Sequence, residues 1–260
     1  MPRLNRVHPR PLWSVKGCLL LHSLVYIHVP KCGGTSFGSA LRLRFFYSQA
    51  TIALGESRAV QSALYPAAHG LARIKAEYAV RDVMLAHLLA QNYRCISVHA
   101  RYHPDLHDRY RGSSAYVTLL RHPVDRFLSH YHYLQRHHPS ADRAATLDAF
   151  LDSPDAARLG AQYLFYFGRT LPFETNDLDQ AIETAKSALG QFTLIGDLSR
   201  ARSFHKALNA LSGIPVPALH RNRAPRPGHL PDGDLLRRLC AICSPDIAIY
   251  EHAQTLRHCA

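Results

Sequence analysis

The sequence lacks a hydrophobic run long enough to cross a bilayer. Its most apolar stretch, residues 18–29, is interrupted by His22 and His28 and is shorter than the roughly 20 residues that a spanning helix needs. The basic first residues, MPRLNRVHPRPLW, are not followed by the long apolar segment and small-residue cleavage site of a secretory signal. We therefore expect a cytoplasmic protein without a transmembrane segment, while peripheral contact with a membrane stays open.

Acidic residues are scarce. The chain has 19 Asp and Glu against 31 Lys and Arg, a formal net charge of +12, and its 18 His add positive charge in mild acid. Such a charge favours an anionic partner, which includes nucleic acid, acidic polysaccharide, an anionic membrane or a highly charged nucleotide. Charge alone does not select among these partners.

Cysteine is too sparse for a disulfide framework. Six cysteines are scattered over 260 residues, whereas disulfide-framed scaffolds are short and dense in cysteine. Cys240 and Cys243 form a CxxC pair, but the pair lies in an apolar run that is typical of a helix. This placement favours buried, reduced thiols, with a zinc site or redox work as the alternative. We expect no metal.

The chain shows no internal repeat and no low-complexity block, and its length fits one domain spanning residues 1–260, with 1–18 as a flexible N-terminal extension. Apolar runs predict strands over residues 19–28, 94–99, 116–120 and 191–195. Helical patterns separate these strands. The order predicts an α/β fold: a three-layer sandwich with a central, mostly parallel sheet, a P-loop-like nucleotide-binding core, and ligands at the carboxyl ends of the strands.

The first strand leads into the sequence PKCGGTS, residues 30–36. Gly33 and Gly34 allow close approach of the backbone to a ligand, Thr35 and Ser36 are expected to cap the next helix, and Lys31 adds a positive charge. Together these features predict an anion cradle at a helix N-terminus. Lys31 precedes both glycines, which differs from the Walker A pattern. The alternative is a Gly-Gly turn with an incidental lysine.

A second constellation lies between residues 116 and 134. Arg121 follows a buried strand, Pro123 suits the first turn of a helix, and Ser129 lies about two turns further along. Arg121 and Ser129 can therefore converge on one phosphate. The alternative is an ion pair between Arg121 and Asp125, with Ser129 as a surface hydroxyl.

The segments HVPKCGGTSF (28–37) and LRHPVDRFLS (120–129) together resemble the sulfotransferases that use 3′-phosphoadenosine-5′-phosphosulfate (PAPS). The resemblance is nearest to the carbohydrate branch, with the heparan and dermatan 2-O-sulfotransferases and their bacterial relatives. CISVHARYH (95–103) and FTLIGDLSRARSFHKALNALSG (192–213) fit it more weakly. His122 stands where that family often has Asp, and Val98 and Ala100 flank His99 where it often has a glycine and an aromatic.

The resemblance implies transfer of a sulfuryl group from PAPS to a hydroxyl acceptor, expected to be a carbohydrate, with no metal and no nucleic acid involved. The catalytic residues would be Lys31, which stabilises the leaving group, and His99, which acts as base, with His103 in reserve. The donor would be bound by Pro30, Lys31, Cys32, Gly33, Gly34, Thr35, Ser36, Arg121 and Ser129. The acceptor would be bound by Arg101, His103, Arg221 and Arg223.

Two other functions stay open at this stage. A phosphotransferase with a variant phosphate loop would need ATP, Mg²⁺ and an acidic metal ligand near a strand end. A non-catalytic binder of nucleic acid or another polyanion would account for the net charge of +12 and would show steep salt dependence.

Overall fold

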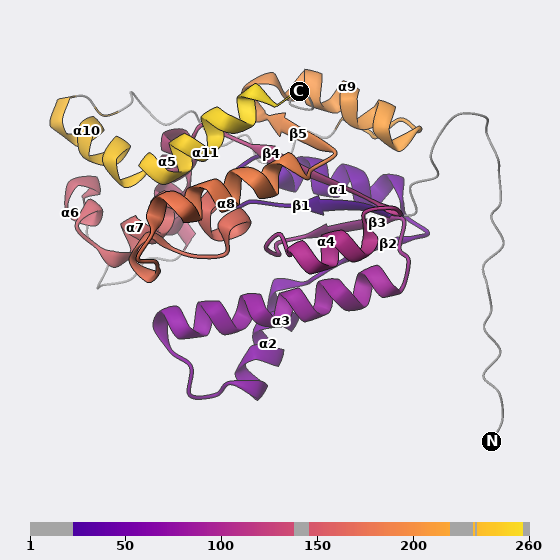
Figure 1. The fold of residues 1–260 in the computed structure, drawn as a ribbon, viewed down its shortest axis with the longest axis horizontal. Coiled ribbons are helices and arrows are strands. Elements are labelled where there is room, and N and C mark those ends of the chain that lie inside the picture. The colour runs from indigo at the N-terminus through magenta and orange to yellow at the C-terminus, as the bar shows by residue number, and fades with distance from the viewer. Residues whose placement is uncertain (1–22, 138–145, 219–230, 232, 257–260) are drawn as a thin grey trace.

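The structure is a computed structural model that describes residues 23–137, 146–218, 231 and 233–256 (Figure 1). The expected flexible extension at residues 1–18 and the predicted acceptor-binding residues Arg221 and Arg223 lie outside this part of the chain.

A five-stranded sheet forms the centre of the molecule. Its strands are β1 (Ser23–Ile27), β2 (Gln49–Thr51), β3 (Cys95–Val98), β4 (Ser114–Leu120) and β5 (Leu194–Asp197). They lie in the order β2-β3-β1-β4-β5, and every neighbouring pair is parallel. Every residue of β1 and β4 is buried, as expected for strands covered on both faces. The predicted α/β fold is confirmed.

Helices cover both faces of the sheet. On one face α1 (Gly34–Arg44) and α9 (Ala201–Ser212) pack against apolar side chains of the strands. The opposite face is covered by α3 (Gly70–Ala90), α4 (Pro104–Tyr110), α8 (Leu178–Gly190) and α11 (Ser244–Thr255). Helix α2 (Leu54–Leu64) packs on α3. These three layers are the expected sandwich.

A smaller apolar cluster joins four helices at one end of the sheet (Figure 1). They are α5 (Pro123–His137), α6 (Leu147–Leu151), α7 (Pro154–Gly160) and α10 (Gly233–Ile242). Between α7 and α8 the chain forms a π-helix, η1 (Leu164–Gly168), followed by a 3₁₀ turn, η2 (Pro172–Glu174). A second 3₁₀ turn, η3 (Leu198–Arg200), lies between β5 and α9.

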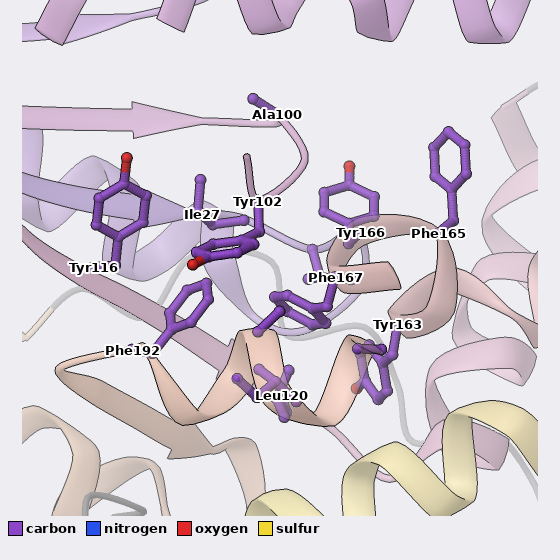
Figure 2. Close-up of a cluster of buried hydrophobic side chains, with 14 of the residues drawn as sticks. Ile27, Ala100, Tyr102, Tyr116, Leu120, Tyr163, Phe165, Tyr166, Phe167 and Phe192 are labelled. Carbon is purple, nitrogen blue, oxygen red and sulfur yellow. The ribbon is translucent and has the colours of Figure 1, made fainter. Parts of the chain in front are cut away.

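Aromatic side chains fill the core between the sheet and η1 (Figure 2). Tyr116 of β4 and Phe167 of η1 both pack edge-on against Phe192, with ring centroids 6.0 and 5.5 Å apart. Edge-to-face packing adds to the free energy gained by burying these rings. The core therefore joins the π-helix to the centre of the sheet.

Several predicted boundaries were wrong for local reasons. The expected cap at Thr35 and Ser36 is not formed, because α1 already begins at Gly34, with Gly33 as its N-cap at φ 74°. The strand expected at residues 191–195 lies at 194–197. Strand β2 and helices α2 and α4 were not predicted; β2 has three residues and no buried one, so it carries no apolar pattern.

Helix α7 ends at Gly160. Gly160 packs directly on the backbone of Ile242 at the end of α10. A side chain here would overlap a backbone carbonyl, so the contact between α7 and α10 requires glycine.

We expect Gly160→Ala to lower the free energy of unfolding by about 1–3 kcal/mol, since the added methyl group must push α7 and α10 apart. Urea unfolding followed by circular dichroism measures this change. Gly190→Ala is the matched control, because no atom lies within 4 Å of its added Cβ. An equal loss of stability in both variants would contradict this account of the packing.

Candidate functional site

A cleft of about 1850 Å³ opens at the carboxyl ends of the strands. Its walls come from the segments that follow β1, β3, β4 and β5, together with α3 and α5. Parallel sheets place their ligands at this edge. Of the predicted donor-binding and catalytic residues, the cleft is lined by Pro30, Lys31, Gly33, Gly34, Thr35, His99, Arg121 and Ser129.

The loop after β1 turns sharply into α1. Lys31 and Gly33 both have left-handed backbones, at φ 68° and 74°. A Cβ on Gly33 would lie 2.6 Å from Leu198, and one on Gly34 would overlap the ring of His28. The two glycines therefore let the loop pack closely, and the first turn of α1, with Gly34 and Thr35, borders the cleft.

Lys31 is a half-buried cation surrounded by other cations. Its Nζ lies 4.2 Å from the centroid of the Tyr133 ring, a cation–π contact. Burial lowers the pKa of Lys31, and the nearby charges of Arg136 and Arg121 lower it further. The guanidinium groups of Arg121 and Arg136 form no ion pair within the described part of the chain. An anion bound here would relieve this repulsion.

Arg121 and Ser129 line the same cleft as Lys31, so the two predicted constellations lie together. The structure shows no ion pair between Arg121 and Asp125, both of which it describes. The main chain of Arg121 is held by Tyr163, whose Oη accepts a hydrogen bond from the Arg121 N–H at 2.8 Å and donates one to the Arg121 carbonyl oxygen.

His99 and His28 form a pair at the ends of β3 and β1, with ring centroids 4.0 Å apart. Burial lowers the pKa of His99 to about 4, the charge of Arg81 adds to this effect, and a hydrogen bond with the His28 backbone opposes it. The pKa of His28 is also well below its usual range, mainly through burial. Both rings are therefore neutral near pH 7, the form that accepts a proton.

The strand end that carries His99 is fixed by Arg81 of α3. Its guanidinium donates to the His99 carbonyl oxygen at 3.0 Å and to Ser57 Oγ at 3.1 Å, and it forms an ion pair with Glu77. Glu77 also lies 3.4 Å from Arg58. Because these bonds hold the backbone of His99, they help to orient its imidazole, which lines the cleft.

Four predicted site residues lie elsewhere. Cys32 is fully buried, with its Sγ 3.5 Å from Tyr163 Oη, and burial raises its pKa to about 11, so it stays a thiol. Ser36 does not line the cleft. Arg101 is buried in an ion pair with Asp82 at 2.8 Å, and His103 is the N-cap residue of α4; neither borders the cleft.

The sequence interpretation missed several residues that line the cleft. On α5, His130, Tyr133 and Arg136 follow Ser129, and their helical spacing was the signal for a shared face. His28 lies two residues before Pro30, where the loop after β1 begins. Asp197 ends β5, but its two oxygens are occupied by the Ser199 N–H at 2.8 Å and the Tyr250 hydroxyl at 2.7 Å.

Within the described residues, no group of three or more His, Cys, Asp or Glu side chains is placed to hold a metal ion. Cys240 and Cys243 form no disulfide, and Cys243 is buried in the cluster of α5, α6, α7 and α10. Among the helices that the structure describes, none has the length and apolar character needed to cross a membrane.

Comparison with models of protein families identifies the family of this chain. A family model described as "Sulfotransferase family" matches residues 21–156, more than half of the 260 residues. The match includes the loop after β1, His99, Arg121 and Ser129. A search of the curated proteins found no match.

Two buried histidines are expected to lower the stability as the pH falls from 7 to 5, while Asp246, whose pKa is raised to about 7 by burial, acts in the opposite direction. His99 has a pKa of about 4 and His130 of about 3 in the folded protein, because both are buried near arginines. Unfolding restores pKa values near 6.5, so the unfolded chain takes up protons first, which costs on the order of 1 kcal/mol per histidine at pH 5.

The thermal unfolding midpoint, measured across this pH range, tests this expectation. His130→Asn removes one of the two groups, so its midpoint should depend less on pH than that of the wild type. If the midpoint of His130→Asn depends on pH as strongly as that of the wild type, the His130 ring is not buried in the neutral form.

Proposed function

The chain belongs to the sulfotransferase family and is therefore a transferase of sulfuryl groups, and from that premise we propose that its donor is PAPS and its acceptor a carbohydrate hydroxyl. One observation carries the proposal: Lys31 and Arg121, from the ends of β1 and β4, line the same cleft as His99. PAPS is anionic at its 5′-phosphosulfate and again at its 3′-phosphate. Two separate cationic loops in one cleft suit such a molecule.

The loop after β1 would bind the 5′ end of the donor. The N–H groups at the start of α1 and the positive end of its dipole favour a phosphosulfate beside Gly34 and Thr35. Arg121 and Ser129 would bind the 3′-phosphate, the guanidinium through charged hydrogen bonds and the hydroxyl through a neutral one. This second site is what would separate PAPS from ATP.

Transfer would proceed by in-line displacement. The bond between sulfur and the bridging oxygen of the 5′-phosphate breaks while the acceptor oxygen bonds to sulfur, and 3′-phosphoadenosine-5′-phosphate leaves. The Lys31 ammonium would stabilise the negative charge that grows on the bridging oxygen. Arg136, which lies close enough to lower the pKa of Lys31, would add positive charge at the same place.

His99 would take the proton of the acceptor hydroxyl. With a pKa of about 4 it is neutral at pH 7 but weakly basic. Proton transfer is therefore expected late, after the acceptor oxygen has begun to bond to sulfur and its proton has become acidic. His103, the reserve base, does not border the cleft, whereas His28 lies beside His99 and takes that reserve place in the proposal.

The acceptor would lie along α2 and α3. This side of the cleft is lined by Arg58, Arg73, Ile74 and Tyr78, a mixture of charged, apolar and aromatic side chains. Such a mixture suits the hydroxyl groups and apolar ring faces of a sugar. Arg101 is paired with Asp82 and His103 caps α4, and neither borders the cleft. We therefore propose that the four residues named above bind the acceptor in their place.

Binding of the donor product separates this proposal from phosphate transfer. We expect 3′-phosphoadenosine-5′-phosphate to raise the thermal unfolding midpoint, since a ligand at 100 times its Kd stabilises by about 2.7 kcal/mol. ATP with Mg²⁺ should raise it much less, and Arg121→Ala should abolish the difference. If ATP with Mg²⁺ raises the midpoint and 3′-phosphoadenosine-5′-phosphate does not, a phosphotransferase is favoured.

Turnover of labelled PAPS tests the catalytic roles. Lys31→Ala should lower kcat by at least about 100-fold, because the charge on the bridging oxygen loses its nearest cation. His99→Ala should also lower kcat, and Arg121→Ala should mainly raise the KM for PAPS. Lys75→Ala is the matched control, since Lys75 is paired with Glu174 and does not border the cleft. Transfer by Lys31→Ala at the wild-type rate would refute the mechanism.

A further inference from the structure

Tyr163 connects the two anion-binding loops through a single oxygen atom. It is fully buried directly before η1 and lies outside the part of the chain that the family model matches. Its Oη accepts a hydrogen bond from the Arg121 N–H at 2.8 Å, donates its one proton to the Arg121 carbonyl oxygen, and lies 3.5 Å from Cys32 Sγ. The Cys32 thiol is also 3.8 Å from the Pro30 carbonyl oxygen.

The position of Tyr163 is itself fixed from the opposite side. The N–H groups of Tyr163 and Leu164 donate to Asp246 Oδ1 at 2.8 and 3.0 Å. Asp246 lies in the first turn of α11, fully buried, and its second oxygen is 3.8 Å from the guanidinium of Arg126. Arg126 also donates to the Leu159 carbonyl oxygen. The two backbone hydrogen bonds to Asp246 Oδ1 therefore fix where Tyr163 enters the core.

We propose that Tyr163 is a positioning residue that sets the separation of the two loops, and so makes the cleft selective for a nucleotide that is phosphorylated at both its 3′ and 5′ positions. The proposal rests on the proposed function for the choice of nucleotide. The loop after β1 would bind one phosphate and Arg121 the other, with Tyr163 holding Cys32 and the Arg121 backbone to one point.

The physical basis is preorganisation. When two binding groups are already at the correct separation, a ligand that uses both does not lose the free energy needed to order them. A ligand with one phosphate uses one loop and gains nothing from the separation. Loss of the Tyr163 hydroxyl should therefore weaken binding of the bisphosphate more than binding of either monophosphate.

The π-helix that follows Tyr163 supplies a matched control. Tyr166 is also fully buried, and its hydroxyl lies 2.7 Å from the hydroxyl of Tyr78. Figure 2 shows the two tyrosine side chains pointing in different directions, Tyr163 toward Leu120 and Tyr166 toward the side on which Ala100 lies. Tyr166→Phe thus removes a buried tyrosine hydroxyl close by in the sequence without touching either loop.

Isothermal titration calorimetry with 3′-phosphoadenosine-5′-phosphate, adenosine 5′-monophosphate and adenosine 3′-monophosphate tests the proposal. The quantity compared is the ratio of the Kd for each monophosphate to the Kd for the bisphosphate. We expect Tyr163→Phe to lower this ratio about tenfold, equivalent to about 1.4 kcal/mol, and Tyr166→Phe to leave it unchanged. General destabilisation would weaken all three ligands alike and would not move the ratio.

If Tyr163→Phe folds and its ratio of monophosphate Kd to bisphosphate Kd equals that of the wild type, the proposal is overturned. If that variant does not fold, as judged by its thermal unfolding, Cys32→Ala tests the same link from the other loop; a lowered ratio supports the proposal and an unchanged ratio overturns it. A wild-type protein without preference for the bisphosphate overturns the proposed donor as well. A wild-type preference that survives in Tyr163→Phe overturns the role of Tyr163 alone.

Discussion

The pairing of β1 with its neighbours β3 and β4 is the constraint on which the site depends. Ile27 pairs with Val98 on one side and with Thr118 on the other, and the Thr118 hydroxyl donates to the Ile27 carbonyl oxygen at 2.9 Å. This register fixes where β3 and β4 end relative to the end of β1. The rings of His28 and His99 therefore meet, and the loop after β1 and Arg121 reach the same cleft.

The cleft holds more positive than negative side chains, and its carboxylates are largely occupied. Glu77 is paired with two arginines, and Asp197 accepts hydrogen bonds from Ser199 and Tyr250. Lys31 is left among like charges, which lower its pKa. Placing cations together in a partly buried site costs stability, and an anionic ligand offsets that cost. The same surroundings keep His28 and His99 neutral.

The part of the chain beyond the family match supports the motifs within it. Tyr163 holds the Arg121 backbone, and Asp246 holds the start of η1. The fully buried guanidinium of Arg126, which belongs to α5 and to the matched part, lies 3.8 Å from Asp246 of α11. These contacts join segments more than 40 residues apart in the sequence. The binding loops are thus held in place by residues that have no ligand-binding chemistry of their own.

The sequence by itself determined the α/β class, the two motifs whose residues line the cleft, and the position of His99 at a strand end. These features are local: a buried strand, a glycine pair and a helix start are each written in a few adjacent residues. Only the tertiary structure decided that Arg101 pairs with Asp82, that Cys32 faces the core, and that α5 contributes Tyr133 and Arg136. The direction of a side chain and the neighbours it meets depend on how distant segments pack, and no short pattern encodes that.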